Sequence, residues 1–190
     1  MAIQCDLAIN SYLDHLTIER GLSRNSIESY KRDLTKFEVM LAESGKNFDS
    51  ITESDISTLV GELSKNGLSP SSINRFLSSV KGFYKYCALE YQLPNPMADV
   101  NQFKIARKLP KALSVEEVSH LIESADNPAI PSTLRDRAIL EVLYGTGARV
   151  AELVGIDVSD ISKDSVDGEE ITIIKLRGKG SKERFVPLGK

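Results

Sequence analysis

The chain has 190 residues, of which 41% are hydrophobic and 27% are charged, and its formal net charge at pH 7 is −3. These values are typical of a globular protein with one large or two small domains, and no apolar run is long enough for a transmembrane helix. The first residues lack the basic and apolar regions of a signal peptide, so the sequence predicts a cytoplasmic location. Cys5 and Cys87 lie far apart and neither has a histidine at metal-ligand spacing, which argues against a disulfide framework and against a metal site.

Four helices are predicted in the first half of the chain from their caps and apolar spacing. Thr52 and Asp55 resemble a capping box, and Pro70 follows a serine at a helix start. The predicted helices cover about 4–20, 23–44, 52–66 and 69–91. Because short connections join them, we expect a compact all-α domain over residues 1–91.

Residues 92–113 are predicted to form a linker between two domains, because Pro94, Pro96 and Pro110 interrupt them. The stretch 104–111 inside this linker holds four basic residues and no acidic one. A charged tether is a place where a chain can pass along a duplex backbone. The alternative interpretation is an ordinary polar linker with solvated lysines.

A second domain is predicted over residues 114–190. A capping box from Ser114 to Glu117 starts a helix that ends near residue 124, and a helical pattern returns at about 133–144. The apolar run that ends at Tyr144 is predicted to be core.

Two β-rich runs at the end of this domain, 170–176 and 183–188, predict a β-hairpin with Lys179 at its tip between two glycines. We expect its apolar face to include Ile171, Ile173, Phe185 and Val186. Residues 175–190 carry six basic residues and one acidic residue, whereas residues 112–174 carry four basic and thirteen acidic ones. Positive charge is therefore concentrated locally, and a polyanion responds to such patches rather than to the net charge.

The stretch 146–153 joins the two parts of this second domain. Gly147 supplies the left-handed backbone of a helix end, and Arg149 then starts a short helix with Glu152 on the same face. An arginine held at a helix start and backed by a carboxylate is suited to anchor a phosphate, since its rigid fork matches phosphate oxygens. The alternative is a surface arginine with a glutamate partner three residues on.

Taken together, these features resemble the tyrosine recombinase (phage integrase) family, and within it the Xer-type recombinases. The resemblance covers the whole chain and is carried by residues 22–34 and 109–114, by LRDRAILEVLYGTGARVAEL at 134–153 and by GKGSKERFVPL at 178–188. Ala148 stands where leucine is usual in the family. The resemblance implies a mainly α fold, with an N-terminal four-helix SAM-like core-binding domain and the N-terminal part of an α+β catalytic domain that has a small β-hairpin or sheet.

The resemblance also implies a chemistry. Arg149 would grip the scissile phosphate, Glu152 would support the site from beside it, and Lys179 would protonate the 5′-oxygen leaving group. The reaction would be site-specific DNA cleavage and rejoining through a 3′-phosphotyrosyl intermediate, with no metal or nucleotide cofactor. The implied partners are a double-stranded recombination site and a second recombinase protomer, in a tetramer on paired sites. Both chromosome-dimer resolution and phage or plasmid integration stay open.

Basic residues of the predicted helices and of the linker are candidate DNA contacts, because most phosphate contacts come from lysine and arginine. These candidates are Arg24, Lys31, Arg32, Arg75, Lys81, Lys85, Lys104, Arg107, Lys108 and Lys111.

The family's nucleophile has no counterpart among these 190 residues. Neither His15 nor His120 is followed by an arginine three residues on, and no tyrosine follows Tyr144. Two hypotheses remain: the chain is the N-terminal two-thirds of a recombinase, or it is a non-catalytic DNA-binding module or competitor from a truncated gene. Under either hypothesis we expect that these 190 residues alone do not cleave DNA.

Overall fold

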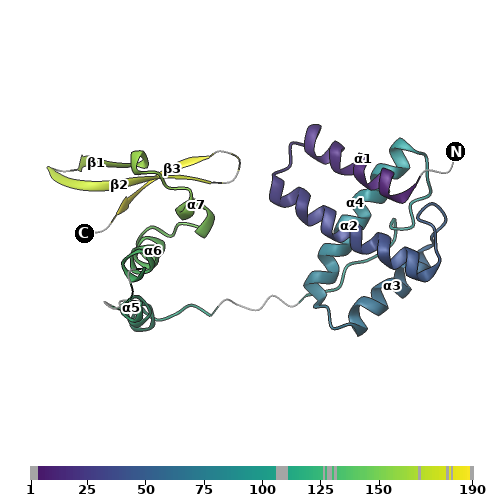
Figure 1. Cartoon of the computed structure of the whole chain (residues 1–190), viewed down its shortest axis with the longest axis horizontal. Coiled ribbons are helices and arrows are strands. Elements are labelled where there is room, and N and C mark those ends of the chain that lie inside the picture. Colours follow the sequence, from purple (N-terminus) through teal and green to yellow (C-terminus); the bar gives the residue numbers. More distant parts are fainter. Residues whose placement is uncertain are drawn as a thin grey trace. The chain divides into compact units, whose positions relative to one another are not determined.

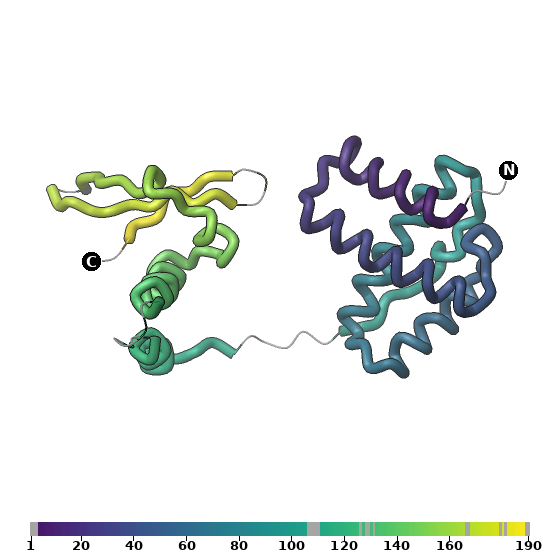
Figure 2. The backbone as a smooth tube through the Cα atoms, viewed as in Figure 1, coloured from purple at the N-terminus to yellow at the C-terminus, as the bar shows by residue number. Residues whose placement is uncertain are grey.

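The computed structural model describes residues 4–105, 111–125, 127, 130, 132–166, 168–178, 180 and 182–188. The chain divides into two compact units, residues 1–108 and 109–190 (Figure 1). The first unit is helical and the second combines helices with a small sheet, which confirms the predicted fold class; Figure 2 traces the backbone of each unit. Within the described part of the chain, no helix has the length and apolar content needed to cross a bilayer.

Among its described residues, the first unit has four helices whose bounds agree with the prediction. They are α1 (Cys5–Ile18), α2 (Arg24–Ser44), α3 (Glu53–Lys65) and α4 (Pro70–Glu90). The capping box predicted for α3 is present: the Asp55 backbone N–H donates to Thr52 Oγ1 at 3.3 Å, and the Thr52 N–H donates to Asp55 Oδ2 at 2.9 Å. Local cap chemistry therefore decides where this helix begins.

The core of the first unit is built around α4, which contacts α1, α2 and α3. Phe83, Tyr84 and Val80 of α4 are fully buried and pack in one cluster with Leu34 and Phe37 of α2. Burying each such side chain contributes about 1.5–3 kcal/mol.

The segment that follows α4 is fastened to the first unit. Met97 is fully buried in the same core. The Asn74 side-chain amide donates to the Phe103 carbonyl and accepts from the Phe103 N–H, both at 2.8 Å. Gln102 Nε2 donates to Ser78 Oγ at 2.8 Å. Residues 92–105 thus belong structurally with α4, whereas the division into 1–91, 92–113 and 114–190 stays a prediction.

In the described part of the second unit, three α-helices accompany a three-stranded antiparallel sheet in the order β1-β2-β3. They are α5 (Val115–Ser124), α6 (Thr133–Thr146), α7 (Val150–Val154), a short 3-10 helix (Val158–Asp160), β1 (Ile161–Val166), β2 (Glu169–Arg177) and β3 (Glu183–Leu188). The hairpin of β2 and β3 is as predicted, and β1 adds a strand that the sequence did not predict.

One residue of the predicted apolar face of the hairpin lies on the other face. Phe185 pairs with Lys175 and Val186 pairs with Ile174, so neighbours 185 and 186 point to opposite sides. Ile171, Ile173 and Phe185 line a hollow of about 450 Å³, and Phe185 is 63% exposed. The inclusion of Val186 in that face was therefore wrong, because side chains alternate along a strand.

The prediction that the apolar run ending at Tyr144 is core was also wrong. No residue of α6 is fully buried, and Tyr144 is 57% exposed. The helix contacts α5, α7 and β3, which cover only part of its apolar surface. Its end is as predicted, because Gly147 adopts the left-handed conformation with φ 60°.

Candidate functional site

The end of α6 and the start of α7 place Arg149 at a turn with a fixed backbone. Its N–H donates to Glu152 Oε2 at 2.8 Å, and its Nη1 donates to Glu152 Oε1 at 2.9 Å. The Arg149 side chain is nevertheless 75% exposed. The guanidinium is therefore held through Nη1 alone, and its other N–H donors face solvent.

Glu152 is a buried carboxylate that binds two arginines. Arg184 of β3 donates from Nη1 to Oε1 at 2.7 Å and from Nη2 to Oε2 at 2.8 Å. These bonds from Arg184, followed by the N–H of Arg149, lower the pKa of Glu152 from its ordinary value of 4.5 to about 2. The same pairing raises the pKa of Arg184. Glu152 thus stays ionised at neutral pH and joins α7 to β3.

The first residue of the turn between β2 and β3, Gly178, lies against the carboxylate of Glu152. The Gly178 N–H donates to the Lys182 carbonyl at 2.7 Å. A Cβ at Gly178 would stand 3.1 Å from Glu152 Oε1, which is a tight contact, so glycine at this position favours the close approach. Lys179 itself lies outside the described residues. The carboxylate of Glu152 is therefore surrounded by Arg149, Arg184 and Gly178, the residue before Lys179.

A second buried carboxylate fixes β2 directly before this turn. Asp160 accepts from Arg177 Nη1 at 2.9 Å and Nη2 at 2.6 Å, and from the Asp157 N–H at 3.0 Å. The Asp157 bond and the cations of Arg177 and Lys175 hold the pKa of Asp160 below its usual range. Arg177 is thus committed to an internal ion pair that anchors the strand leading to Gly178.

The candidate DNA contacts among the described residues are all exposed, but three of them already have partners. Arg24 pairs with Glu28 at 3.0 Å, and Lys81 Nζ donates to the Ala98 carbonyl at 3.5 Å. Arg75 Nη1 donates to the buried Asp33 at 2.8 Å. The exposed candidates with no recorded partner in the described residues are Lys31, Arg32, Lys85, Lys104 and Lys111. Arg107 and Lys108 lie outside the described residues.

Sequence reasoning found the Arg149–Glu152 pair but missed Arg184 and Asp33. Arg184 follows the candidate turn lysine by five residues in an alternating strand, where a charge is usually a solvated residue. Asp33 is the first of five buried residues in α2, the others being Leu34, Phe37, Met40 and Leu41. An acid next to an apolar core position was the available signal for Asp33.

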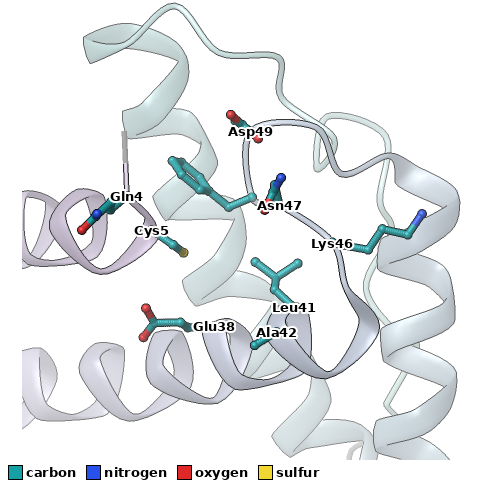
Figure 3. Close-up of a pocket in the computed structure, with 9 residues that line it drawn as sticks. Gln4, Cys5, Glu38, Leu41, Ala42, Lys46, Asn47 and Asp49 are labelled. Carbon is teal, nitrogen blue, oxygen red and sulfur yellow. The ribbon is translucent and has the colours of Figure 1, made fainter. Parts of the chain in front are cut away.

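The first unit also contains a hollow of about 410 Å³ near the start of α1 (Figure 3). The Cys5 sulfur points into it, and burial raises the pKa of Cys5 to about 12. Lys46 at its rim pairs with Asp55 at 3.1 Å. The thiol is therefore protonated at neutral pH and is a poor nucleophile. Across the described ranges, no three His, Cys, Asp or Glu side chains group closely enough to hold a metal ion.

Comparison with family models gives two matches. Residues 9–90 match the phage integrase N-terminal SAM-like domain, and residues 111–190 match the phage integrase family. The tyrosine recombinase XerC of Alcanivorax borkumensis is 37% identical over 183 residues, covering 96% of this chain and 57% of that protein. The tyrosine recombinase XerD of Mycobacterium tuberculosis is 39% identical over 196 residues, covering 97% and 61%. The chain thus spans about three fifths of the length of these relatives.

Solved structures with the same fold include two recombinases bound to DNA. A lambda integrase tetramer bound to a Holliday junction has a TM-score of 0.70 at 19% identity, covering 98% of this chain and 51% of that one. The XerH site-specific recombinase bound to a palindromic difH substrate has a TM-score of 0.67 at 19% identity, covering 98% and 54%. At these identities the likeness shows the fold alone.

Proposed function

The chain belongs to the phage integrase (tyrosine recombinase) family, with Xer-type recombinases among its relatives, and on that premise we propose that the protein recombines DNA at specific sites. The observation that carries the proposal is the set of hydrogen bonds made by the Glu152 carboxylate. Its carboxylate holds Arg149 by the backbone and by one guanidinium nitrogen, and leaves the rest of that side chain exposed. An arginine that is oriented before the substrate arrives stabilises charge on a phosphate without reorganisation at the moment of reaction.

In this proposal, Arg149 binds the non-bridging oxygens of the scissile phosphate. A tyrosine oxygen attacks the phosphorus, the bond to the 5′-oxygen breaks, and a 3′-phosphotyrosyl bond forms. Lys179 gives its proton to the departing 5′-oxygen. The position of Gly178 against Glu152 supports this role for its neighbour, since the turn begins beside the carboxylate that holds Arg149. None of the tyrosines in these 190 residues is assigned as the nucleophile.

The proposed partners are a double-stranded recombination site and further protomers of the recombinase, in a tetramer on paired sites. The complex of XerH with its difH substrate supports the DNA partner, and the lambda integrase tetramer bound to a Holliday junction supports the tetramer. Chromosome-dimer resolution and integration both fit the proposal, since they differ in the DNA site and not in the chemistry.

DNA binding without cleavage is the second candidate function for these 190 residues taken by themselves. The 190 residues contain no His-x-x-Arg sequence and no tyrosine after Tyr144. Incubating this chain with a nicked Xer-type duplex and running a denaturing gel tests for a covalent adduct. We expect binding without an adduct, whereas a covalent DNA–protein species would show that these residues include a nucleophile.

Binding of the chain to labelled duplexes across a salt series tests the proposal itself. One duplex carries a Xer-type recombination site, and the control is its scrambled sequence. We expect tighter binding to the site and a steep loss of affinity with salt, because phosphate contacts release counterions. Equal affinity for both duplexes, or no binding at low salt, would contradict the proposal.

A further inference from the structure

A buried acid in the first unit binds a candidate DNA-contacting arginine. Asp33 of α2 is only 3% exposed, and its Oδ2 accepts two hydrogen bonds from α4. Arg75 Nη1 donates at 2.8 Å and Ser79 Oγ donates at 2.9 Å. The carboxylate therefore joins the two helices at a point where α2 and α4 pack against each other (Figure 1).

Helix packing alone does not account for an acid at this position. Taking a carboxylate out of water is costly, and replacing a buried ion pair with apolar residues is often neutral or stabilising. Leu34, the next residue, shows that α2 buries apolar side chains in the core directly beside it. What the acid adds, and a leucine would not, is a fixed direction for the Arg75 guanidinium.

The surroundings of Arg75 are suited to a phosphate. Small polar side chains line a groove of about 380 Å³ between the two helices, among them Asn25, Ser26, Ser29 and Ser78. The Arg75 side chain is half exposed at this groove. Of its five N–H donors, only one on Nη1 has a recorded acceptor in the part of the chain that the structure describes. The remaining donors of Arg75 match the oxygens of a phosphodiester.

We propose that Asp33 is a positioning residue that holds Arg75 at this groove, so that the free N–H donors of Arg75 meet a phosphate of the DNA backbone. The proposal rests on the proposed DNA-binding function and adds a residue that acts through Arg75 without touching DNA itself. Phosphate contacts carry no base sequence, so the contact serves any duplex that the chain binds.

The sign of one substitution separates this role from simple charge repulsion. Asp33→Asn removes one negative charge from a DNA-binding surface, which by Coulomb attraction alone would strengthen binding. If Asp33 positions Arg75, the same substitution weakens binding instead. The probe is a labelled duplex of mixed sequence at low salt, and the readout is fluorescence anisotropy. The matched control is Glu43→Gln, which removes one negative charge at an exposed position of the same helix.

The expected loss of DNA affinity is that of one charge-assisted hydrogen-bonded contact. Arg75→Ala should weaken binding about tenfold, as the loss of one such contact implies. It should also reduce the slope of log affinity against log salt by about 0.9. Asp33→Asn should cause a large part of the loss of affinity expected for Arg75→Ala. Glu43→Gln should leave the affinity unchanged or raise it slightly.

A double-mutant cycle shows whether Asp33 acts through Arg75. In the Arg75→Ala background, Asp33→Asn should cause no further loss, because no guanidinium is left to position. A structural role would weaken binding in both backgrounds. Arg75→Lys keeps the positive charge but removes the planar guanidinium, and the site is half exposed, so the variant should fold. It should lose most of the DNA affinity that Arg75→Ala loses. Thermal unfolding of each variant, followed by circular dichroism, confirms that the first unit is folded.

The outcomes distinguish this proposal from the function on which it rests. If the unmodified chain does not bind DNA at low salt, both fail. If it binds but Asp33→Asn tightens binding as Glu43→Gln does, or Arg75→Lys binds as well as the unmodified chain, the positioning role fails while DNA binding stands. Weakening by Asp33→Asn that disappears in the Arg75→Ala background supports the proposal.

Discussion

Buried carboxylates hold several arginines of this protein in place. Glu152 holds Arg149 and Arg184, and Asp33 holds Arg75. The sequence predicted the first pair, because residues three apart in a helix share a face. It did not predict the other two, whose partners lie 32 and 42 residues apart, since local periodicity carries no information about contacts at that separation.

The acid stability of the second unit should depend on Glu152. The folded-state pKa of Glu152 is lowered from 4.5 to about 2, so its ionised form stabilises the fold fully above about pH 4.5. This contribution is lost as the pH falls from about 4.5 to about 2. Hydrogen exchange of the β2 and β3 amides, measured across this range, should show protection falling with pH.

Two variants test this assignment. In Glu152→Gln, the protection of β2 and β3 should already be reduced at neutral pH and should change less between pH 4.5 and 2. In Arg184→Ala, a carboxyl NMR titration should give a higher pKa for Glu152, because the substitution removes the hydrogen bonds that lower this pKa most. An unchanged pKa in Arg184→Ala would contradict the assigned cause.

At the scale of elements, the helices were predictable because local chemistry defines their ends. Ser114 and Glu117 form a complete capping box at the start of α5, with bonds of 3.2 and 2.7 Å. Strand β1 was missed because its sequence, ISKDSV, has a weak β pattern and becomes a strand by pairing with β2. The amphipathic pattern of α6 predicted a buried face, but how far that face is covered depends on its neighbours.

Two helical glycines should respond oppositely to the same substitution. Alanine is favoured over glycine inside a helix by about 1 kcal/mol, and Gly61 of α3 has open space at its Cβ position. At Gly82 of α4, a Cβ would collide with the Tyr12 hydroxyl and lie 3.5 Å from its Cζ. Tyr12 cannot easily move, because it packs against the rings of Tyr30 and Tyr86.

Gly61→Ala should therefore raise the melting temperature of the first unit, and Gly82→Ala should lower it, since overpacking costs about 1–3 kcal/mol. Thermal unfolding followed by circular dichroism measures both. A rise in melting temperature for Gly82→Ala would mean that α1 shifts freely on α4.

At the scale of the whole molecule, charge is distributed unevenly over a chain with a net charge of −3. The stretch 104–111 holds four basic residues, and it follows a segment that Asn74 and Ser78 fasten to α4. The start of the basic stretch, at Lys104, therefore lies close to a defined place on the first unit. This arrangement supports the hypothesis that the tether follows a DNA backbone.

Neutralising the two described lysines of this stretch should weaken DNA binding without regard to sequence. Lys104→Ala with Lys111→Ala should reduce the salt slope by about 2, because about 0.9 is lost for each phosphate contact. Affinities for a Xer-type site and for its scrambled sequence should fall by the same factor. Loss confined to the specific duplex, or an unchanged slope for both, would contradict a backbone contact by the tether.

The central claim is that Arg149, held by Glu152, binds one particular phosphate of the recombination site. The most direct measurement compares the unmodified chain with Arg149→Ala on Xer-type duplexes that each carry one neutral methylphosphonate, placed at successive positions. We predict one position per strand at which the neutral group weakens binding of the unmodified chain about tenfold but does not weaken binding of Arg149→Ala further. If Arg149→Ala binds as tightly as the unmodified chain, or loses affinity equally at every position, Arg149 is not the phosphate anchor of this site.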